Sequence, residues 1–385
     1  ENYAETDPLN GRDFLTFEDG TRSYFPERIP RTVKFKINDS DPDDQYAKLY
    51  AQEVVDIINK LNLPRYGLGN YISNKPKDPP AKEETLLIQN LSRGGKRLMG
   101  FCRTNLFKRL ESSGYSFLLS IERHILRNYI FIHAIENKKA IPVGTQEAEL
   151  LDTRLKDEDE PDLLEEDDED ENNSISEKED VKTAEDFQHK AEVIYNTYTT
   201  KYRKKFKWLR SSLFNKTLLK DLKFDTEALL DVLKQCSNWD PFRDEKLNSL
   251  VKLLNKKYKS ERILVFTQFA DTARYIEEQL KARNISAIAS VTGESSDPTG
   301  LVWRFSPVNN DKNIPSEEQL RILIATDILS EGQNLQDCFI VINYDLPWAI
   351  IRLIQRAGRI DRIGQQSENI FCYSFLPAEG VERII

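Results

Sequence analysis

The chain has 385 residues, 39 % of them hydrophobic and 31 % charged, with 55 Lys and Arg against 64 Asp and Glu. This balance is typical of soluble globular proteins, and the length predicts about two or three domains. No apolar run approaches the roughly 18 to 20 residues of a membrane span, which argues against an integral membrane protein. No basic-then-apolar leader opens the chain, so we expect no secretion signal and a cytoplasmic location. The chain begins at Glu1 without a methionine, which predicts an internal fragment or a chain that lost its N-terminus.

Cysteine usage points to the same compartment. The four cysteines are far apart, no C-x-x-C pair occurs, and the three histidines fall at no ligand spacing near them. We therefore expect no structural zinc, no other metal ligands and no disulfide framework. Free cysteines suit a reducing cytoplasm.

The acidity of the chain is local. Residues 157–171 hold 12 acids and no base, and without them the formal charge of −9 becomes +3. A block of like charges repels itself and usually stays solvated. We expect 157–180 to be a disordered-like linker or insertion tip, with a regulatory tail that mimics nucleic acid as the alternative.

The first half of the chain reads as mainly helical. Residues 32–37 (T-V-K-F-K-I) alternate at period two and predict a strand within a mixed segment, 1–40. Apolar residues then recur at three and four from 41 to about 60, and again over 83–137, 184–222 and 226–236. These periods predict a helical insertion domain over 41–243.

At Asp244 the pattern changes. One helix is predicted over 244–258, and helices over 271–283 and 350–362 lie between short apolar runs at 262–267, 287–291, 321–325, 339–343 and 370–374. Strands that alternate with helices indicate a parallel sheet covered on both faces. Residues 244–385 are therefore predicted to be a doubly wound α/β domain.

Residues 355–362 (Q-R-A-G-R-I-D-R) carry a row of arginines. On an ideal helix, Gln355, Arg359 and Arg362 lie within about 60° of one another. The permanently charged, planar guanidinium matches phosphate oxygens, so this side predicts a phosphate site. The opposite side is expected to pack on the sheet through Ile350, Leu353, Ile354, Ala357 and Ile360.

This segment and four others resemble motifs of one family, the Swi/Snf-type superfamily-two helicases and translocases. In chain order they are 265–269 (V-F-T-Q-F, motif IV), Thr292–Gly293 with Arg304–Phe305, 325–335 (A-T-D-I-L-S-E-G-Q-N-L, motif V), 343–348 (N-Y-D-L-P-W) and 355–365 (motif VI). The resemblance implies a RecA-like second helicase lobe over 244–385. The spelling of motifs V and VI is similar to that of bacterial members.

The resemblance extends more loosely upstream. Residues 108–113 (K-R-L-E-S-S) look like a helix of bacterial Swi/Snf-like helicases, and 25–37 look like the crossover out of a first lobe. Residues 1–40 are then a crossover segment from an N-terminal RecA-like lobe that this chain lacks.

The resemblance also implies roles for individual residues. Arg359 and Arg362, with Gln355, would act as arginine fingers on ATP. The nucleotide side would also involve Asp327, Gly332 and Asn334. The nucleic-acid backbone would be contacted, without reading of bases, by Thr267, Gln268, Thr292, Gly293 and Thr326.

Two basic patches lie outside the predicted lobe, at 93–109 and 201–210. The second (K-Y-R-K-K-F-K-W-L-R) includes Lys204 and Lys205 with interleaved aromatics, of which Tyr202 and Phe206, one turn apart, are expected to pack inward. The bases predict a salt-dependent, sequence-independent track for duplex DNA. A solvated helix face is the alternative.

The sequence contains no G-x-x-x-x-G-K-[ST] and no D-E-x-[HD]. ATP and Mg²⁺ are therefore expected to be held mainly by the absent first lobe, and this chain alone is expected to be inactive. We predict the C-terminal lobe of an ATP-dependent translocase on double-stranded DNA. A remodeller of protein–nucleic-acid complexes such as stalled RNA polymerase, a non-enzymatic nucleic-acid-binding module and an RNA helicase remain alternatives.

Overall fold

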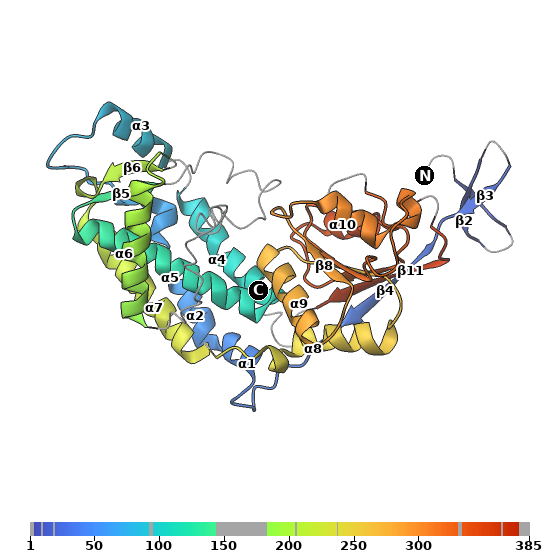
Figure 1. The fold of residues 1–385 in the computed structure, drawn as a ribbon. Helices are drawn as coiled ribbons and strands as arrows, with labels where there is room; N and C mark the ends of the chain where they lie inside the picture. The colour runs from blue at the N-terminus through green and yellow to red at the C-terminus, as the bar shows by residue number, and fades with distance from the viewer. Residues whose placement is uncertain are drawn as a thin grey trace. The chain divides into compact units, whose positions relative to one another are not determined.

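The computed structural model describes residues 4–8, 11–17, 20–91, 95–143, 183–204, 206–236, 238–329, 333–362 and 365–376. The chain divides into two compact units (Figure 1). The first holds Glu1–Ile37, Glu111–Ser113 and Asp240–Glu382, and the second holds Asn38–Leu110 and Gly114–Trp239. The predicted acidic stretch 157–180 lies outside the described residues.

The first unit is built on a six-stranded sheet in which every neighbouring pair of strands is parallel. Across the sheet the order is β4 (Glu27–Val33), β11 (Asn369–Phe375), β10 (Ile340–Asn343), β7 (Ile263–Phe266), β9 (Ile322–Ala325) and β8 (Ile288–Val291). Every residue of β7, β9 and β10 is buried, which explains their uninterrupted apolar sequences. The predicted RecA-like doubly wound sheet is confirmed.

The strand expected over 32–37 lies earlier, as β4. This strand takes an edge of the sheet and pairs in parallel with β11, from Glu27 beside Asn369 to Val33 beside Phe375. Most of its side chains are exposed, and Pro30 is tolerated there because an edge strand needs fewer ladder hydrogen bonds. An exposed edge strand lacks the apolar alternation that the sequence analysis used, so its position was missed.

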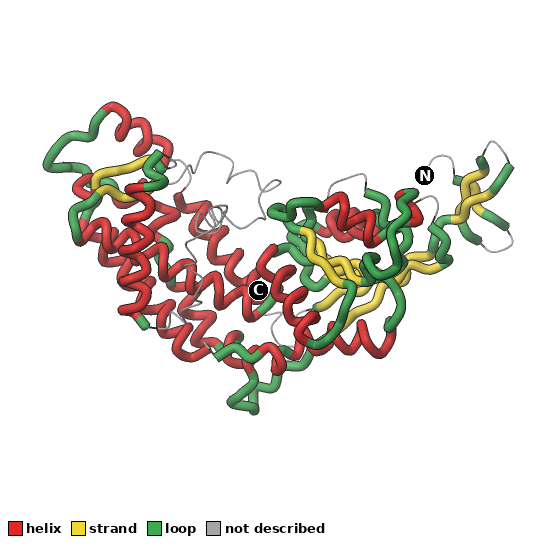
Figure 2. The backbone as a smooth tube through the Cα atoms, viewed as in Figure 1, coloured by secondary structure: helices red, strands yellow, loops and turns green. Residues whose placement is uncertain are grey.

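Helices cover the sheet of the first unit (Figure 2). They are α8 (Glu245–Lys252), α9 (Ala270–Ala282), α10 (Pro298–Phe305) and α11 (Ile350–Ala357), with a π-helical turn at Leu253–Lys257 and 3₁₀ turns at Pro241–Arg243 and Val308–Asn310. Asp244 and Asp297 cap α8 and α10 by accepting from main-chain N–H groups. A small antiparallel sheet precedes β4: β1 (Glu5–Thr6), β2 (Asp13–Thr16) and β3 (Arg22–Tyr24).

The second unit is mainly helical. Its helices are α1 (Gln45–Leu49), α2 (Gln52–Lys60), α3 (Lys82–Leu91), α4 (Gly95–Ser112), α5 (Gly114–Glu136), α6 (Ala184–Thr200) and α7 (Lys216–Cys236), with 3₁₀ segments at Pro64–Tyr71 and Ser211–Leu213. Helix α5 packs against both α6 and α7. The last two residues of α4 belong to the first unit.

Two helix predictions in this unit are wrong in part. The helix expected over 41–60 is two helices, because the chain breaks at Tyr50 and Ala51 between α1 and α2. The helical stretch expected over 184–222 is interrupted by β6 (Lys207–Arg210), which pairs antiparallel with β5 (Ala140–Val143) in a two-stranded sheet. The β-forming partner of β6 lies more than 60 residues away in the sequence, so no local period revealed it.

Within the described residues, no helix is long and apolar enough to cross a membrane. All four cysteines are free. The same residues contain no group of three or more His, Cys, Asp or Glu side chains arranged to hold a metal ion.

Candidate functional site

The motif residues of the first unit meet where the parallel strands end. Asp327, just after β9, accepts two hydrogen bonds from Arg356 on α11: from Nε to Oδ1 at 2.6 Å and from Nη2 to Oδ2 at 3.0 Å. Arg352, one helical turn earlier, donates to the same carboxylate at 3.3 Å. A guanidinium held by two parallel bonds is a strong and directional Arg–carboxylate geometry. Motif V is thus clamped to motif VI.

Arg356 is only 2 % exposed. Its Nη1 donates to Asn343 Oδ1 and to the Asp345 carbonyl, both at 3.2 Å, and its guanidinium lies 5.2 Å from the ring centre of Phe266. A buried charge is tolerated when it is paired and its donors find acceptors. Arg356 therefore ties together the ends of β7, β9 and β10.

The sequence alone did not single out Arg356, and the phosphate role was predicted for its neighbours. The available signal was the four-residue spacing of Arg352 and Arg356, which places both on one helical face. A single carboxylate in motif V, Asp327, then suffices to hold that face against the sheet.

The expected apolar face of this segment is right in part. Ala357 and Ile360 are buried as predicted, but Ile350 and Ile354 are 77 % and 51 % exposed, and the neighbouring Ile351 is 57 % exposed. Within α11 the buried side is formed by Arg356 and Ala357. The physical reason is twofold: α11 ends at Ala357, before Gly358, so the helical phase does not continue to Arg362, and the ion pair with Asp327 sets which side faces inward.

Arg359 and Arg362 follow α11 in a turn, and both are half-buried. Arg362 donates to Asn334 Oδ1 at 3.4 Å and to the Gly358 carbonyl at 3.3 Å. The structure thus brings Arg362 to the predicted nucleotide-side residue Asn334. Gln355 is exposed on α11, and Gly332 lies outside the described residues.

The predicted nucleic-acid residues lie at the ends of β7, β8 and β9. Thr267 is fully buried and its hydroxyl donates to the Asp345 carboxylate, so this hydroxyl is not presented to a phosphate. Thr326 Oγ1 and Gln268 Oε1 are buried and have no hydrogen-bond partner. Thr292 is buried and Gly293 beside it is exposed. Buried polar atoms without a partner cost free energy, and two of them lie just after β7 and β9.

The basic patches of the second unit are partly structural. Arg103 donates to the Leu61 carbonyl, and Arg109 is buried. Arg210 holds Glu84 with two hydrogen bonds, of 2.9 and 2.8 Å, and these hydrogen bonds lower the pKa of Glu84 to about 2. These three arginines brace the fold and are poorly placed to bind a ligand.

The turn after α6 differs from these arginines because its basic side chains are exposed. Lys201, Arg203 and Lys204 are exposed there, whereas Lys205 lies outside the described residues. Trp208 Nε1 donates to the Arg203 carbonyl at 2.9 Å, and the Tyr198 and Phe206 rings lie 4.4 Å apart beneath the turn. The expected helical spacing of Tyr202 and Phe206 is wrong because the chain turns and then enters β6. Aromatic packing holds three cations on one turn.

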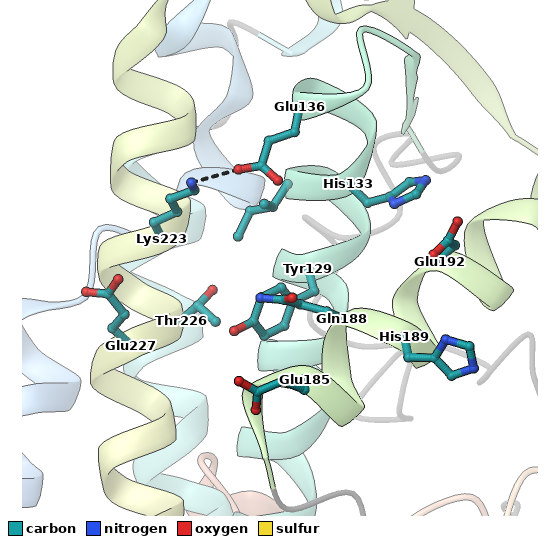
Figure 3. Close-up of a pocket in the computed structure, with 11 residues that line it drawn as sticks. Tyr129, His133, Glu136, Glu185, Gln188, His189, Glu192, Lys223, Thr226 and Glu227 are labelled. Carbon is teal, nitrogen blue, oxygen red and sulfur yellow. Dashed lines mark ion pairs between the residues drawn. The ribbon is translucent and has the colours of Figure 1, made fainter.

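A pocket of about 500 Å³ lies among α5, α6 and α7 of the second unit (Figure 3). Lys223 is ion-paired with Glu136 at 2.7 Å on its wall. Burial and the nearby Lys139 ammonium lower the pKa of His133 in the lining. None of the predicted motif residues lines this pocket, which was not foreseen from the sequence.

Comparison with known proteins finds similarity to helicases. Residues 245–364 match the family model of the helicase conserved C-terminal domain. Over 158 residues the chain is 32 % identical to the ATP-dependent helicase YqhH of Bacillus subtilis (strain 168), covering 41 % of this chain and 25 % of that protein. Over 136 residues it is 34 % identical to the RNA polymerase-associated protein RapA of Vibrio cholerae serotype O1 (strain M66-2), covering 34 % of this chain and 13 % of that protein.

A solved structure, the C-terminal part of the Fun30 ATPase domain, aligns over 94 % of this chain and 88 % of that chain, with 16 % identity and a TM-score of 0.41. The helicase match bears out the resemblance drawn from the motifs: residues 245–364 match a helicase conserved C-terminal domain, and the two curated relatives are bacterial proteins. The chain spans a quarter or less of the length of these curated relatives.

Proposed function

We propose that this chain is the second lobe of an ATP-driven motor that moves along double-stranded DNA. One observation carries the proposal: the Asp327–Arg356 clamp joins motif V to motif VI at the carboxyl edge of the sheet, with Arg359 and Arg362 in the turn just beyond. Ligands of open α/β sheets bind outside this edge.

The residues at the edge fit the phosphates of ATP. Arg356 is paired with Asp327. Arg359 and Arg362 are half-buried, and Arg362 donates a hydrogen bond to Asn334. We assign the arginine-finger role to this pair, which would stabilise the charge that builds on the transferred phosphoryl group. Bound ATP supplies that group. We propose that its Mg²⁺ and phosphate loop are held by a first lobe, because the sequence of this chain contains no phosphate-loop motif.

The proposed nucleic-acid contacts depend on the polar atoms at the carboxyl edge of the sheet that have no hydrogen-bond partner. Thr326 Oγ1 has a proton to donate, which suits a backbone phosphate oxygen. Gln268 Oε1 is an acceptor, because the amide nitrogen of this residue already donates to the Leu346 carbonyl at 2.7 Å, so it would take a bridging water. The exposed Gly293 lets the main chain approach closely. Contacts of this kind grip the backbone without reading sequence.

Helix α11 also presents an exposed apolar row, formed by Ile350, Ile351 and Ile354. This row supports a contact between this lobe and a first lobe. An apolar row next to a charged site is typical of a surface that another protein part covers. We propose that an N-terminal RecA-like lobe covers this apolar row when nucleotide is bound. We also propose that the motor works in the cytoplasm.

A remodeller of transcription complexes is the second candidate. RapA is named as associated with RNA polymerase, and it is 34 % identical to this chain over 136 residues. In that case the same lobe would drive movement against a bound polymerase.

The test is ATP hydrolysis by the natural protein that carries this chain, with duplex DNA, single-stranded DNA or RNA added. Stimulation by duplex DNA, lost by about 10³-fold or more in the Arg359→Ala, Arg362→Ala double variant, supports the motor. Lys281→Ala, an exposed cation on α9 paired with Glu277, is the matched control. Stimulation only by RNA would replace the DNA assignment, and a folded protein without hydrolysis would leave a binding module.

A further inference from the structure

Between α4 and α5 the chain enters the first unit for three residues, Glu111–Ser113. Ser112 is the last residue of α4 and is fully buried. Its hydroxyl donates to Asp345 Oδ2 at 2.5 Å and lies 2.9 Å from Thr272 Oγ1 on α9. Because a serine has one proton and gives it to the carboxylate, the Thr272 hydroxyl must donate to Ser112.

Asp345 is the centre of this cluster and is 1 % exposed. Besides Ser112, its carboxylate accepts from Thr267 Oγ1 at 2.5 Å and from the main-chain N–H of Gln268 at 2.9 Å. Hydrogen bonds to a carboxylate are shorter and stronger than neutral ones, and a buried carboxylate needs several of them. Three donors, one from the end of α4 and two from the adjacent residues Thr267 and Gln268, thus fix one side chain.

Lys246 fixes the end of α4 from the other side. Its buried ammonium donates to the Glu111 carbonyl at 2.5 Å and to the Ser112 carbonyl at 2.8 Å. The last carbonyls of a helix have no partner within the helix, so this lysine caps α4. The ammonium also lies 4.3 Å from the ring centre of Tyr344, whose pKa burial raises well above its usual range, so that ring stays neutral.

The cluster continues directly into the candidate site. The main-chain carbonyl of Asp345 accepts from Arg356, the residue that clamps Asp327. The next carbonyl, that of Leu346, accepts from the side chain of Gln268. A shift of Asp345 would therefore move Gln268 and Arg356 together.

We propose that Ser112 is a positioning residue of the motor: acting through Asp345, it holds the Gln268 loop and Arg356 in place, and so makes the edge of the sheet respond to the end of α4. The proposal rests on the motor function for its activity test, but not for its structural test. Ser112 touches neither ATP nor nucleic acid in this scheme and acts only through its neighbours.

The structural test is hydrogen exchange at the main-chain amides of 268–272 in Ser112→Ala. Exchange should be about tenfold faster, because the amide of Gln268 loses a firmly held acceptor. The matched control is Ser120→Ala, a buried serine of α5 whose hydroxyl donates to the Ser116 carbonyl of its own helix. Should Ser112→Ala fail to fold, Thr272→Val keeps the side-chain shape and removes the hydroxyl that supports Ser112.

The activity test uses the natural full-length protein. Ser112→Ala should lower the duplex-stimulated kcat about fivefold, because the Gln268 loop and Arg356 are held less firmly. The KM for ATP should be unchanged, because Ser112 does not touch the nucleotide. Exchange at 268–272 equal to that of Ser120→Ala overturns the proposal, as does faster exchange with an unchanged stimulated kcat. A wild-type protein without duplex stimulation instead refutes the motor function, and the exchange measurement then decides on the cluster by itself.

Discussion

The two units use buried charge in different ways. In the first unit, Asp327, Asp345 and Arg356 lie at the ends of parallel strands and join motifs that are far apart in the sequence. In the second unit, Asp225 on α7 accepts from the main-chain N–H groups of Asn62 and Leu63, and Arg210 holds Glu84. Charge in the first unit organises an edge where a ligand can bind, whereas charge in the second unit ties helices and loops together.

This difference follows from the architecture. All strands of a parallel sheet end on the same side, so polar residues that follow several strands are brought to one place. A helical bundle has no such shared edge, and its buried charges find partners at helix ends and in loops. We therefore expect substitutions of the buried charges in the first unit to disturb both the edge of the sheet and the stability of the fold, and substitutions of the buried charges in the second unit to disturb stability alone.

The largest effect is expected at the clamp. Asp327→Ala leaves the Arg356 guanidinium buried without its carboxylate and should destabilise the chain by about 3 kcal/mol. Urea unfolding measures this loss. Lys281→Ala, which breaks an exposed pair with Glu277, should change stability by less than about 0.5 kcal/mol. Equal losses in the two variants would mean that the clamp is no more than a surface ion pair.

A packing variant sharpens the comparison within the second unit. A Cβ at Gly114 would lie 2.3 Å from the Trp239 ring, so Gly114→Ala should destabilise the protein by about 2 kcal/mol. At Gly100 on α4, nothing lies within 4 Å of an added Cβ. Gly100→Ala should therefore stabilise by about 0.5 to 1 kcal/mol, because alanine favours the helix. Thermal unfolding of the two variants should move in opposite directions.

Asp225 gives the second unit a pH dependence. Burial is the main cause that raises the pKa of its carboxyl to about 6, so the folded protein binds this proton more tightly than the unfolded chain does. The stability that Asp225 contributes is thus present at low pH and is lost as the pH rises through about 6. Between pH 7 and pH 4.5, the stability of the wild type relative to Asp225→Asn should grow by about 1 to 2 kcal/mol. A difference that stays constant over this range would contradict the assignment.

The smallest effect is expected at the exposed turn after α6. Replacing Lys201, Arg203 and Lys204 by Gln should leave folding unchanged but weaken duplex DNA binding about tenfold. The salt slope of binding should fall by about one for each backbone phosphate that these side chains no longer neutralise. Lys190→Gln, an exposed lysine of α6, is the control. An unchanged salt slope would leave the turn as a solvated surface.

The sequence predicted the strands of the first unit closely. The runs at 262–267, 321–325 and 339–343 contain β7, β9 and β10, because strands buried on both faces must be apolar throughout. The edge strand β4 was only partly predicted and the strand β6 was not predicted, since neither has a continuous apolar sequence and both pair with strands remote in the chain.

The candidate site was likewise predicted only in part from the sequence. Motif spelling alone placed Asp327, Asn334 and Arg362 in one functional group, and the structure brings Arg362 to Asn334. It did not reveal that Arg356 is the buried clamp, because the length of α11 and its rotation depend on the ion pair with Asp327. Nor did it show that Thr267 turns its hydroxyl toward Asp345.

The class of protein follows from the sequence alone, since short apolar strands, their order and the motifs between them are local properties of the chain. The packed fold decides which charged and hydroxyl groups bind one another at the carboxyl edge of the sheet. It also decides which of these groups remain available to a ligand. The K-R-L-E-S-S segment shows the reason: Ser112 acquires its role from Asp345, 233 residues away, and such a pairing depends on how the elements pack rather than on any local pattern.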